Sequence, residues 1–247
     1  MNLNTIMPTT KMLKCFTATM VLFLITIPIG CDDESSSDRV SPNEAITKAV
    51  KAMDSLDAYR DKSFTVQLNH EQSDWALIPS DDWENVTDYE YSAPDRHHFV
   101  TVGEDIWSES VIIGDQKWWR GKTSHLSHLA WGIAGEEGRP NVEVLNEFQS
   151  FIQCDDMQLL GSEVIEGTDC YIIRLTKEVK EIPDLEEITA DIWAGKKDYL
   201  IRQVISITPI PYSEPEYFQC LVKHYYDFNE PINIEPPLQS EFMANNE

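Results

Sequence analysis

The chain has 247 residues, 42% of them hydrophobic, and a formal net charge of −24. This length is enough for one domain with a sizeable core, and it makes a division into two domains less favoured. A surface this negative repels phosphate backbones and anionic lipid headgroups. The charge therefore argues against nucleic acid as a partner and against membrane binding through surface charge.

Residues 1–30 have the features of a signal peptide. Two lysines precede an apolar stretch, residues 16–27, that is too short to span a membrane comfortably. The sequence "IPIGC" then resembles the bacterial lipobox, in which cleavage leaves the cysteine as the first mature residue with a diacylglyceryl chain on its thiol. The resemblance implies lipid attachment at Cys31, a tether over residues 31–41, and a location at the extracytoplasmic face of the cell membrane. An uncleaved anchor or a signal cleaved elsewhere stays open.

The segment after the tether predicts an amphipathic helix. Ser41 can cap it, Pro42 suits its first position, and Glu44 can complete a capping box. Apolar residues then recur at helical spacing over about four turns: Ile46, Ala49, Val50, Met53 and Leu56. The apolar side of this helix needs a surface on which to pack.

Most of the remaining chain predicts short β-strands separated by turns. The first five β-rich runs, from 63 to 121, are broken by proline and glycine as in an antiparallel meander. An irregular loop is expected over 123–139 and a second helix over 140–152. Five more strands are expected at 157–164, 169–177, 187–194, 199–207 and 217–228. These elements indicate an α+β fold, a curved antiparallel sheet of about ten strands with helices on its concave face.

The carboxy-terminal strands can be aligned by their alternating pattern. A turn at "GKKD" pairs Ile192 with Ile201 and brings Asp191 opposite Arg202 on the other face. The same alternation predicts one broad apolar face that also holds Tyr171, Ile173, Leu175, Ile205, Phe218, Val222, Tyr226 and Phe228.

The motifs "YSAPDRHHF", "VIIGDQKWWRG" and "ADIWAGKKDYLIRQV" accompany the lipobox cysteine and the two helices. With them, residues 43–228 resemble the LolA-like superfamily of lipoprotein carriers, in particular the LppX/LprG type. The resemblance implies an open half-barrel of antiparallel strands over residues 42–230, closed by helices around an apolar cavity that holds acyl chains. It implies no catalytic residue and no cofactor. An acidic, proline-containing tail, residues 231–247, follows this domain.

We therefore expect an exported, lipid-anchored protein that binds a lipid or another apolar ligand in a cavity between sheet and helices, for carriage or presentation. The alternative is a structural or surface-interaction lipoprotein of the cell envelope, with a packed core and no ligand. The sequence contains no G-x-S-x-G, H-E-x-x-H, C-x-x-C or glycine-rich phosphate motif, so we expect no enzyme activity. The sequence identifies no partner protein.

Histidines are the best candidate metal ligands in the sequence, but their positions do not predict a metal site. His97 and His98 are adjacent on a predicted strand, so they point to opposite faces and cannot share an ion. His125 and His128 could chelate an ion only if their segment were helical and a carboxylate joined them.

Several aromatic and polar residues are candidates for a ligand site. Trp118 and Trp119 are adjacent on a strand, so one ring should enter the core while the other faces outward. Gln203 and His224 fall within the predicted apolar face, where they either bond to each other, to Tyr226 or to a trapped water, or hold a ligand headgroup. The full set of candidates is Gln203, His224, Trp107, Trp118, Trp119, Ile192, Ile201 and Tyr226.

Three cysteines remain after the anchor, so at most one internal disulfide can form in an oxidising compartment. The predicted alignment puts Cys170 too far from either partner. Cys154 and Cys220 fall at the same end of the sheet, and we predict a bridge between them. A chain with three free thiols stays open.

Overall fold

The computed structural model describes residues 40–69, 85–122, 127–135, 147–178, 187–210 and 217–242. The predicted signal peptide, Cys31 and the tether to residue 39 lie outside the described residues. Residues 40–247 form one structural unit. No helix in the described ranges is both long and apolar enough to cross a membrane.

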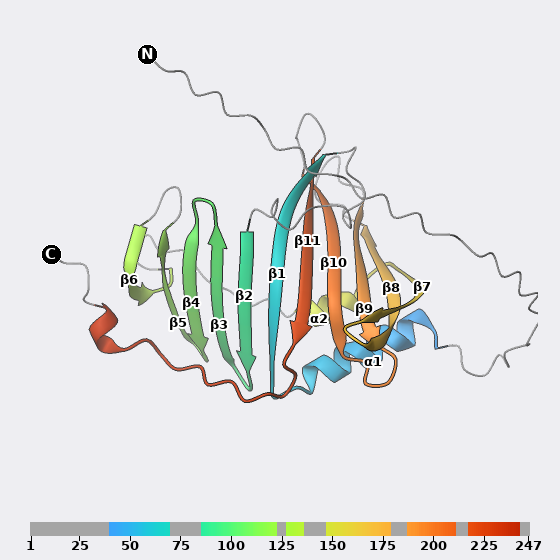
Figure 1. Ribbon diagram of the computed structural model, residues 1–247, viewed down its shortest axis with the longest axis horizontal. Coiled ribbons are helices and arrows are strands. Elements are labelled where there is room, and N and C mark those ends of the chain that lie inside the picture. Colours follow the sequence, from blue (N-terminus) through green and yellow to red (C-terminus); the bar gives the residue numbers. More distant parts are fainter. Residues whose placement is uncertain are drawn as a thin grey trace, which may run out of the picture. The chain divides into compact units, whose positions relative to one another are not determined.

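Eleven strands form one open antiparallel sheet, with β6 at one edge and β7 at the other (Figure 1). The order is β6-β5-β4-β3-β2-β1-β11-β10-β9-β8-β7, so two meanders meet where β1 pairs with β11. The strands are β1 (Ala58–Asn69), β2 (Asn85–Ser92), β3 (Arg96–Gly103), β4 (Trp107–Ile113), β5 (Gln116–Lys122), β6 (Ser127–Ile133), β7 (Asp156–Ile165), β8 (Thr168–Glu178), β9 (Glu187–Gly195), β10 (Ile201–Ile210) and β11 (Tyr217–Tyr226).

The predicted antiparallel sheet is confirmed, but it gains a strand that the sequence analysis assigned to a loop. Strand β6 lies within the predicted loop over 123–139 and pairs with β5, Trp119 opposite Gly132 and Gly121 opposite His128. Its sequence, "SHLAWGI", alternates Leu129, Trp131 and Ile133 with smaller residues, but the run is short and the glycines and polar residues around it favoured a loop. The segment is a strand because it pairs with the neighbouring strand β5, and the spacing of residues along the chain does not indicate that pairing.

Helix α1 (Pro42–Asp54) begins as its sequence predicts. The Ser41 hydroxyl accepts a hydrogen bond of 3.2 Å from the backbone N–H of Glu44. Five of its side chains are buried: Ala45, Ile46, Ala49, Val50 and Met53. They pack with strands β8 to β10, and the backbone N–H of Ile201 lies 3.4 Å from the Met53 sulfur.

Helix α2 (Glu147–Phe151) falls within the predicted second helix, whose residues 140–146 lie outside the described ranges. Phe148 and Phe151 are buried in the same cluster as α1. The Gln149 side chain also donates a hydrogen bond to Asp54 at the end of α1. The two helices therefore share one core.

The two faces of the sheet differ in what they pack against. We call the side that packs with α1 the helix face, and its buried residues include Tyr59, Tyr89, Ile173, Leu175, Ile192, Ala194, Ile201, Val204 and Tyr225. We call the other side the opposite face, and its buried cluster is Val66, Leu68, Cys170, Trp193, Ile205, Cys220 and Val222. Apolar side chains are thus buried on both sides of the sheet.

Strand β10 departs from the predicted alignment at Arg202. Ile201 pairs with Ala194 rather than with Ile192, and pairing resumes at Gln203 after one extra residue, a β-bulge. Because side chains alternate with a period of two, one inserted residue exchanges the faces of everything that follows it. The predicted pairing of Ile192 with Ile201 is therefore wrong.

The residues beyond the bulge lie on faces that unbroken alternation did not predict. Val204 joins Ile201 on the helix face. Ile205 lies on the opposite face, with Phe218 and Val222 of the neighbouring strand. The prediction that these last three residues share the face of Ile201 is wrong, because it assumed no bulge.

The bulge also changes the ion pairs. Asp191 pairs with Arg174 of β8 at 2.7 Å, and Arg202 pairs with Asp198. The Arg202 guanidinium in addition lies 4.5 Å from the centre of the Phe228 ring. The predicted pair of Asp191 with Arg202 does not form.

Cys154, Cys170 and Cys220 are free in this structure. Cys154 packs against the cluster on the helix face, whereas Cys170 and Cys220 belong to the cluster on the opposite face. Burial raises the pKa of the Cys220 thiol to about 11. The predicted bridge between Cys154 and Cys220 is absent because the sheet separates them, which matches the alternative of three free thiols.

The first prediction concerns the packing of α1. We expect Ile46→Ala to lower the free energy of unfolding by about 2–4 kcal/mol, because Ile46 is fully buried and its loss leaves a cavity. Lys51→Ala, on the exposed side of the same helix, serves as the control and should change it by less than about 0.5 kcal/mol. Denaturant unfolding of the full chain measures both, and equal losses would contradict the packing described here.

Candidate ligand-binding face of the sheet

The structure divides the eight predicted ligand-binding residues between the two faces. Trp119, Ile192 and Ile201 lie on the helix face. Pairing and packing place the other five on the opposite face: Trp107, Trp118, Gln203, His224 and Tyr226. The wrong alignment of the carboxy-terminal strands explains why the sequence analysis placed Gln203, His224 and Tyr226 on the same face as Ile192 and Ile201.

The three candidates on the helix face are buried. Ile192 and Ile201 are fully buried against α1 and belong to the core. Trp119 is 3% exposed, and its ring meets the edge of His128 with centroids 6.1 Å apart. Trp118, its neighbour in sequence, packs on the other side of the sheet with Val111 and Trp131. The prediction that the two adjacent tryptophans face opposite ways is confirmed.

Gln203 of β10 and His224 of β11 lie directly opposite each other, so they are neighbours on one face, as the sequence analysis expected. They lie on the opposite face, however, beside Ile205 and Val222. Gln203 is buried, and burial also lowers the pKa of His224, whose ring meets the edge of Phe64. Their surroundings are a packed cluster away from the helices.

The helix face carries a row of six paired residues, four of them aromatic, of which the sequence analysis singled out only Trp119. Direct cross-strand pairing connects Tyr225, Asp61, Tyr89, Phe99, Ser110 and Trp119, from β11 through β1 to β5. We call this set the aromatic row. The rings of Tyr89 and Phe99 lie 4.7 Å apart. The signal in the sequence was the spacing of two residues between Tyr89 and Tyr91 and between His97 and Phe99, which puts both rings of each pair on one face of a strand. The row itself is recognised only once the partner of each strand is known.

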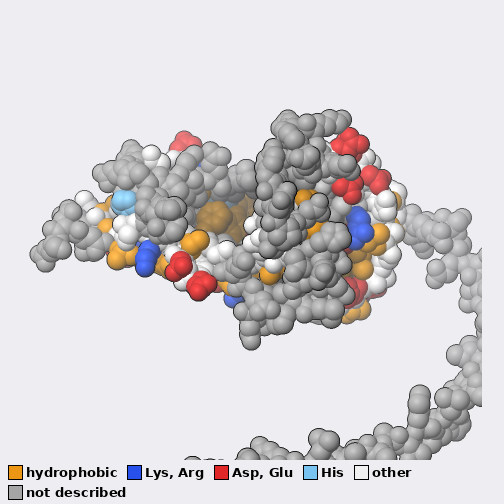
Figure 2. Space-filling model, turned by 90° about the horizontal axis from the view of Figure 1, so that it is seen from above, with side chains coloured by type: hydrophobic (Ala, Val, Ile, Leu, Met, Phe, Trp, Pro, Cys, Tyr) orange, Lys and Arg blue, Asp and Glu red, His pale blue; other side chains and the backbone are white. Residues whose placement is uncertain are grey.

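Further rings gather where the aromatic row meets the helices. Tyr59 lies 5.9 Å from Tyr225, 5.7 Å from Tyr89 and 6.0 Å from Phe148 of α2, measured between ring centroids. The space-filling view along the strands shows hydrophobic side chains set back in a hollow of the surface (Figure 2). This part of the face is suited to contact with apolar molecules.

A second row on the helix face consists of hydroxyl side chains. Ser63, Thr87, Thr101 and Ser108 are paired directly across β1 to β4, and we call them the hydroxyl row. All four are half-buried, and the Thr87 and Thr101 hydroxyls share a hydrogen bond of 3.0 Å. Gly121 continues the row on β5, where a Cβ atom would lie only 2.8 Å from the Ser108 Cα, so glycine permits the close approach of these strands.

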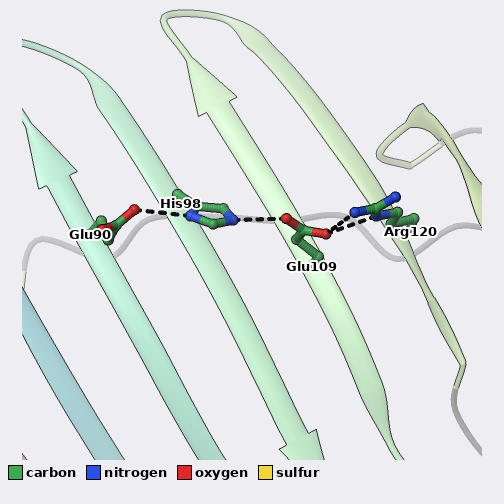
Figure 3. Close-up of polar contacts among 4 residues, drawn as sticks. All are labelled: Glu90, His98, Glu109 and Arg120. Carbon is green, nitrogen blue, oxygen red and sulfur yellow. Dashed lines mark hydrogen bonds and ion pairs between the residues drawn. The ribbon is translucent and has the colours of Figure 1, made fainter. Parts of the chain in front are cut away.

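The opposite face of the same strands carries a connected set of charged groups (Figure 3). Arg60 donates to Glu90 at 2.8 Å, and His98 bridges Glu90 at 3.1 Å and Glu109 at 3.0 Å. Arg120 of β5 completes the set with a bond of 2.8 Å to Glu109. We call these five residues the charged network. Each side chain neutralises its neighbour across the strands, which suits a face that meets water.

The two adjacent histidines of β3 experience these two environments. The hydrogen bond with Glu109 raises the pKa of His98 against the effect of its burial, with a further contribution from Glu90. Burial lowers the pKa of His97, whose Nδ1 lies 2.7 Å from the Tyr89 hydroxyl on the helix face. The predicted placement of His97 and His98 on opposite faces is therefore confirmed.

The candidate metal ligands are not brought together. Within the described ranges, no group of three or more His, Cys, Asp or Glu side chains could hold a metal ion. His125 lies outside those ranges, and His128 packs against Trp119. Glu90, His98 and Glu109 form a line across three strands rather than a converging set.

The second prediction uses the two histidines as matched probes of pH. The folded pKa of His98 lies above its unfolded value of about 6.5, so its stabilising effect is complete below that pH and is lost as the pH rises through the raised pKa. We expect His98→Gln to lower the free energy of unfolding by about 1 kcal/mol at pH 6 and by less at pH 8.5. His97→Gln should show the reverse trend, because the lowered pKa of His97 favours folding above pH 6.5. Chemical unfolding at the two pH values measures both, and parallel trends would contradict the assigned environments.

No protein-family model and no curated protein matches the chain. LprF from Mycobacterium bovis is similar in structure over 79% of this chain and 96% of its own, with a TM-score of 0.51 and 10% identity. The lipoprotein LppX from Mycobacterium tuberculosis covers 78% of this chain and 97% of its own, with a TM-score of 0.49 and 15% identity. A LolA-superfamily protein from Nitrosomonas europaea covers 83% and 98%, with a TM-score of 0.28 and 11% identity.

At 10% identity the likeness to LprF is one of fold alone. The open eleven-stranded sheet and the core that it shares with α1 and α2 agree with the motifs quoted from the sequence. The chain therefore shares its fold with LprF over most of its length.

Proposed function

We propose that the protein is an exported, lipid-anchored carrier or presenter of a lipid or another apolar molecule, which lies on the helix face of strands β1 to β5. The observation that carries this proposal is the distribution of charge. In a chain with a net charge of −24, these strands place the aromatic and hydroxyl rows on one face and the charged network on the other. A face poor in charge in so acidic a protein is suited to an apolar partner.

The mechanism is physical and involves no bond chemistry. An acyl chain that leaves water for this face gains about 0.8 kcal/mol for each methylene buried. Helices α1 and α2 already pack on the adjoining part of the face, next to Tyr59 and Tyr225. A small displacement of the helices would extend the apolar surface toward the aromatic row.

A second function is favoured by the burial of part of this face. Ile112 is 4% exposed and Trp119 is 3% exposed, so these side chains are packed without a ligand. The packing supports a structural or surface-interaction lipoprotein whose interior is simply its core. Binding of an apolar molecule decides between the two functions.

The third prediction places a charge on either face of one strand. Thr101→Glu puts a carboxylate on the helix face, and Val102→Glu puts one on the opposite face at the adjacent, exposed residue, whose cross-strand partners Val86 and Trp107 are uncharged. In the full chain carrying Cys31→Ser, we expect Thr101→Glu to weaken binding of an uncharged fluorescent acyl-chain probe by roughly tenfold or more, because a buried charge is costly. Val102→Glu should bind like its parent. Absence of probe binding in the parent, and of co-purifying lipid by native mass spectrometry, would favour the packed-core function.

The fourth prediction concerns the anchor. We expect Cys31→Ser in cells to release the protein from membranes or to leave an uncleaved precursor, because stable attachment needs more than one acyl chain and the variant cannot be acylated. Membrane fractionation and the mass of the mature protein measure this. Normal processing with unchanged membrane attachment would overturn lipid attachment at Cys31.

A further inference from the structure

The helix face of strands β1 to β4 changes character along the strand direction. The hydroxyl row lies two residues from the aromatic row on each strand, for example Thr101 from Phe99. Two residues of a strand span about 7 Å. A molecule that lies along β2 and β3 therefore meets the rings of Tyr89 and Phe99 and, about 7 Å further on, the hydroxyl groups of Thr87 and Thr101.

Charge is almost absent from this part of the face. Among the described residues of β1 to β5, only Asp61 and Lys117 are charged groups on it, and neither belongs to the hydroxyl row. Lys223 of β11 pairs with Ser63 at one end of the row, with its ammonium 5.8 Å from the centre of the Tyr225 ring. Thr101 and Ser108 lie three and four strands from that lysine, or about 14 and 19 Å.

Hydroxyl groups donate and accept hydrogen bonds without supplying charge. A hydroxyl or ester oxygen could satisfy its hydrogen bonds on such a row at little cost. A phosphate would lose its hydration without gaining a positive partner, and Asp61 in the next row would not attract it. The arginines of these strands, Arg60, Arg96 and Arg120, lie on the other face. Arg60 and Arg120 belong to the charged network, and Arg96 donates a hydrogen bond to the backbone carbonyl of Ile234.

Resting on the function proposed above, we propose that the hydroxyl row binds an uncharged, oxygen-bearing polar part of the ligand and discriminates against lipids that carry a phosphate. Thr87, Thr101 and Ser108 are then specificity-determining residues. The aromatic row contacts the apolar part of the same molecule.

The test compares two lipids that differ only in the phosphate. Diacylglycerol and phosphatidate with identical acyl chains compete against the uncharged fluorescent acyl-chain probe on the full chain carrying Cys31→Ser. We expect diacylglycerol to compete at a concentration at least about tenfold lower than phosphatidate. Thr101→Val and Ser108→Ala should each weaken competition by diacylglycerol about fivefold, the effect of one lost hydrogen bond.

Thr189→Val is the matched control, because Thr189 pairs with Ile207 on the opposite face, and it should change neither lipid. Equal competition by the two lipids, or a preference for phosphatidate, overturns the discrimination, and this comparison needs no substitution. A diacylglycerol preference that survives both Thr101→Val and Ser108→Ala removes the hydroxyl row from the explanation. A protein that binds no probe at all overturns the proposed function itself, so the two failures are distinguishable.

Discussion

The pairing of β1 with β11 is the constraint on which the rest of the structure depends. It joins residues 148 to 166 positions apart, from Asn69 opposite Tyr217 to Arg60 opposite Tyr226. Each meander forms from neighbours in sequence, but only this contact makes one sheet of the two. The aromatic row passes through it, since Tyr225 and Asp61 stand on its two sides. Any surface shared by the helices and strands β2 to β5 exists because this pairing fixes their alignment.

The continuous sheet then acts as a partition between two electrostatic environments. Its opposite face at β2 to β5 holds the charged network, in which burial and hydrogen bonding compete and hydrogen bonding prevails. Glu90 shows this competition, because burial favours its neutral form while Arg60 and His98 together lower its pKa. On the helix face burial prevails, and His97 is held toward its neutral form. Adjacent residues of one strand are therefore tuned in opposite directions by the side to which they point.

Local pattern was sufficient for much of this fold. The cap at Ser41 and the apolar spacing of α1 are properties of neighbouring residues, and they predicted the helix correctly. The alternation in β8 and β9 likewise placed Ile173 and Ile192 on the same face. The bulge at Arg202 is different, because a single extra residue in a strand leaves the hydrophobic pattern plausible in either alignment.

The extra residue at Arg202 explains most of the errors in the predicted faces of the candidate ligand-binding residues. It moved Gln203, His224 and Val222 to the opposite face, and with them the expected polar pair of the ligand site. Strand β6 and the aromatic row were missed for a related reason, since both are defined by cross-strand partners rather than by spacing along the chain. The faces of a sheet can be predicted from sequence only as well as its alignment can.

The two halves of the helix face are filled by different means, and this bears on how a ligand could enter. At β8 to β10 the face is closed by α1, whose aliphatic side chains interlock with Ile173, Ile192 and Ile201 at full burial. At the junction with β1, the ring of Phe148 of α2 lies 5.7 Å from Tyr225 and 6.0 Å from Tyr59, measured between centroids. Phe151 is buried beside Phe148, and the Gln149 side chain donates a hydrogen bond to α1. Elements with few buried contacts open at lower free energy than those in a close-packed core. Among the described residues, α2 therefore closes this face with fewer buried side chains than α1, and Phe148 is its contact with Tyr225 at the end of the aromatic row.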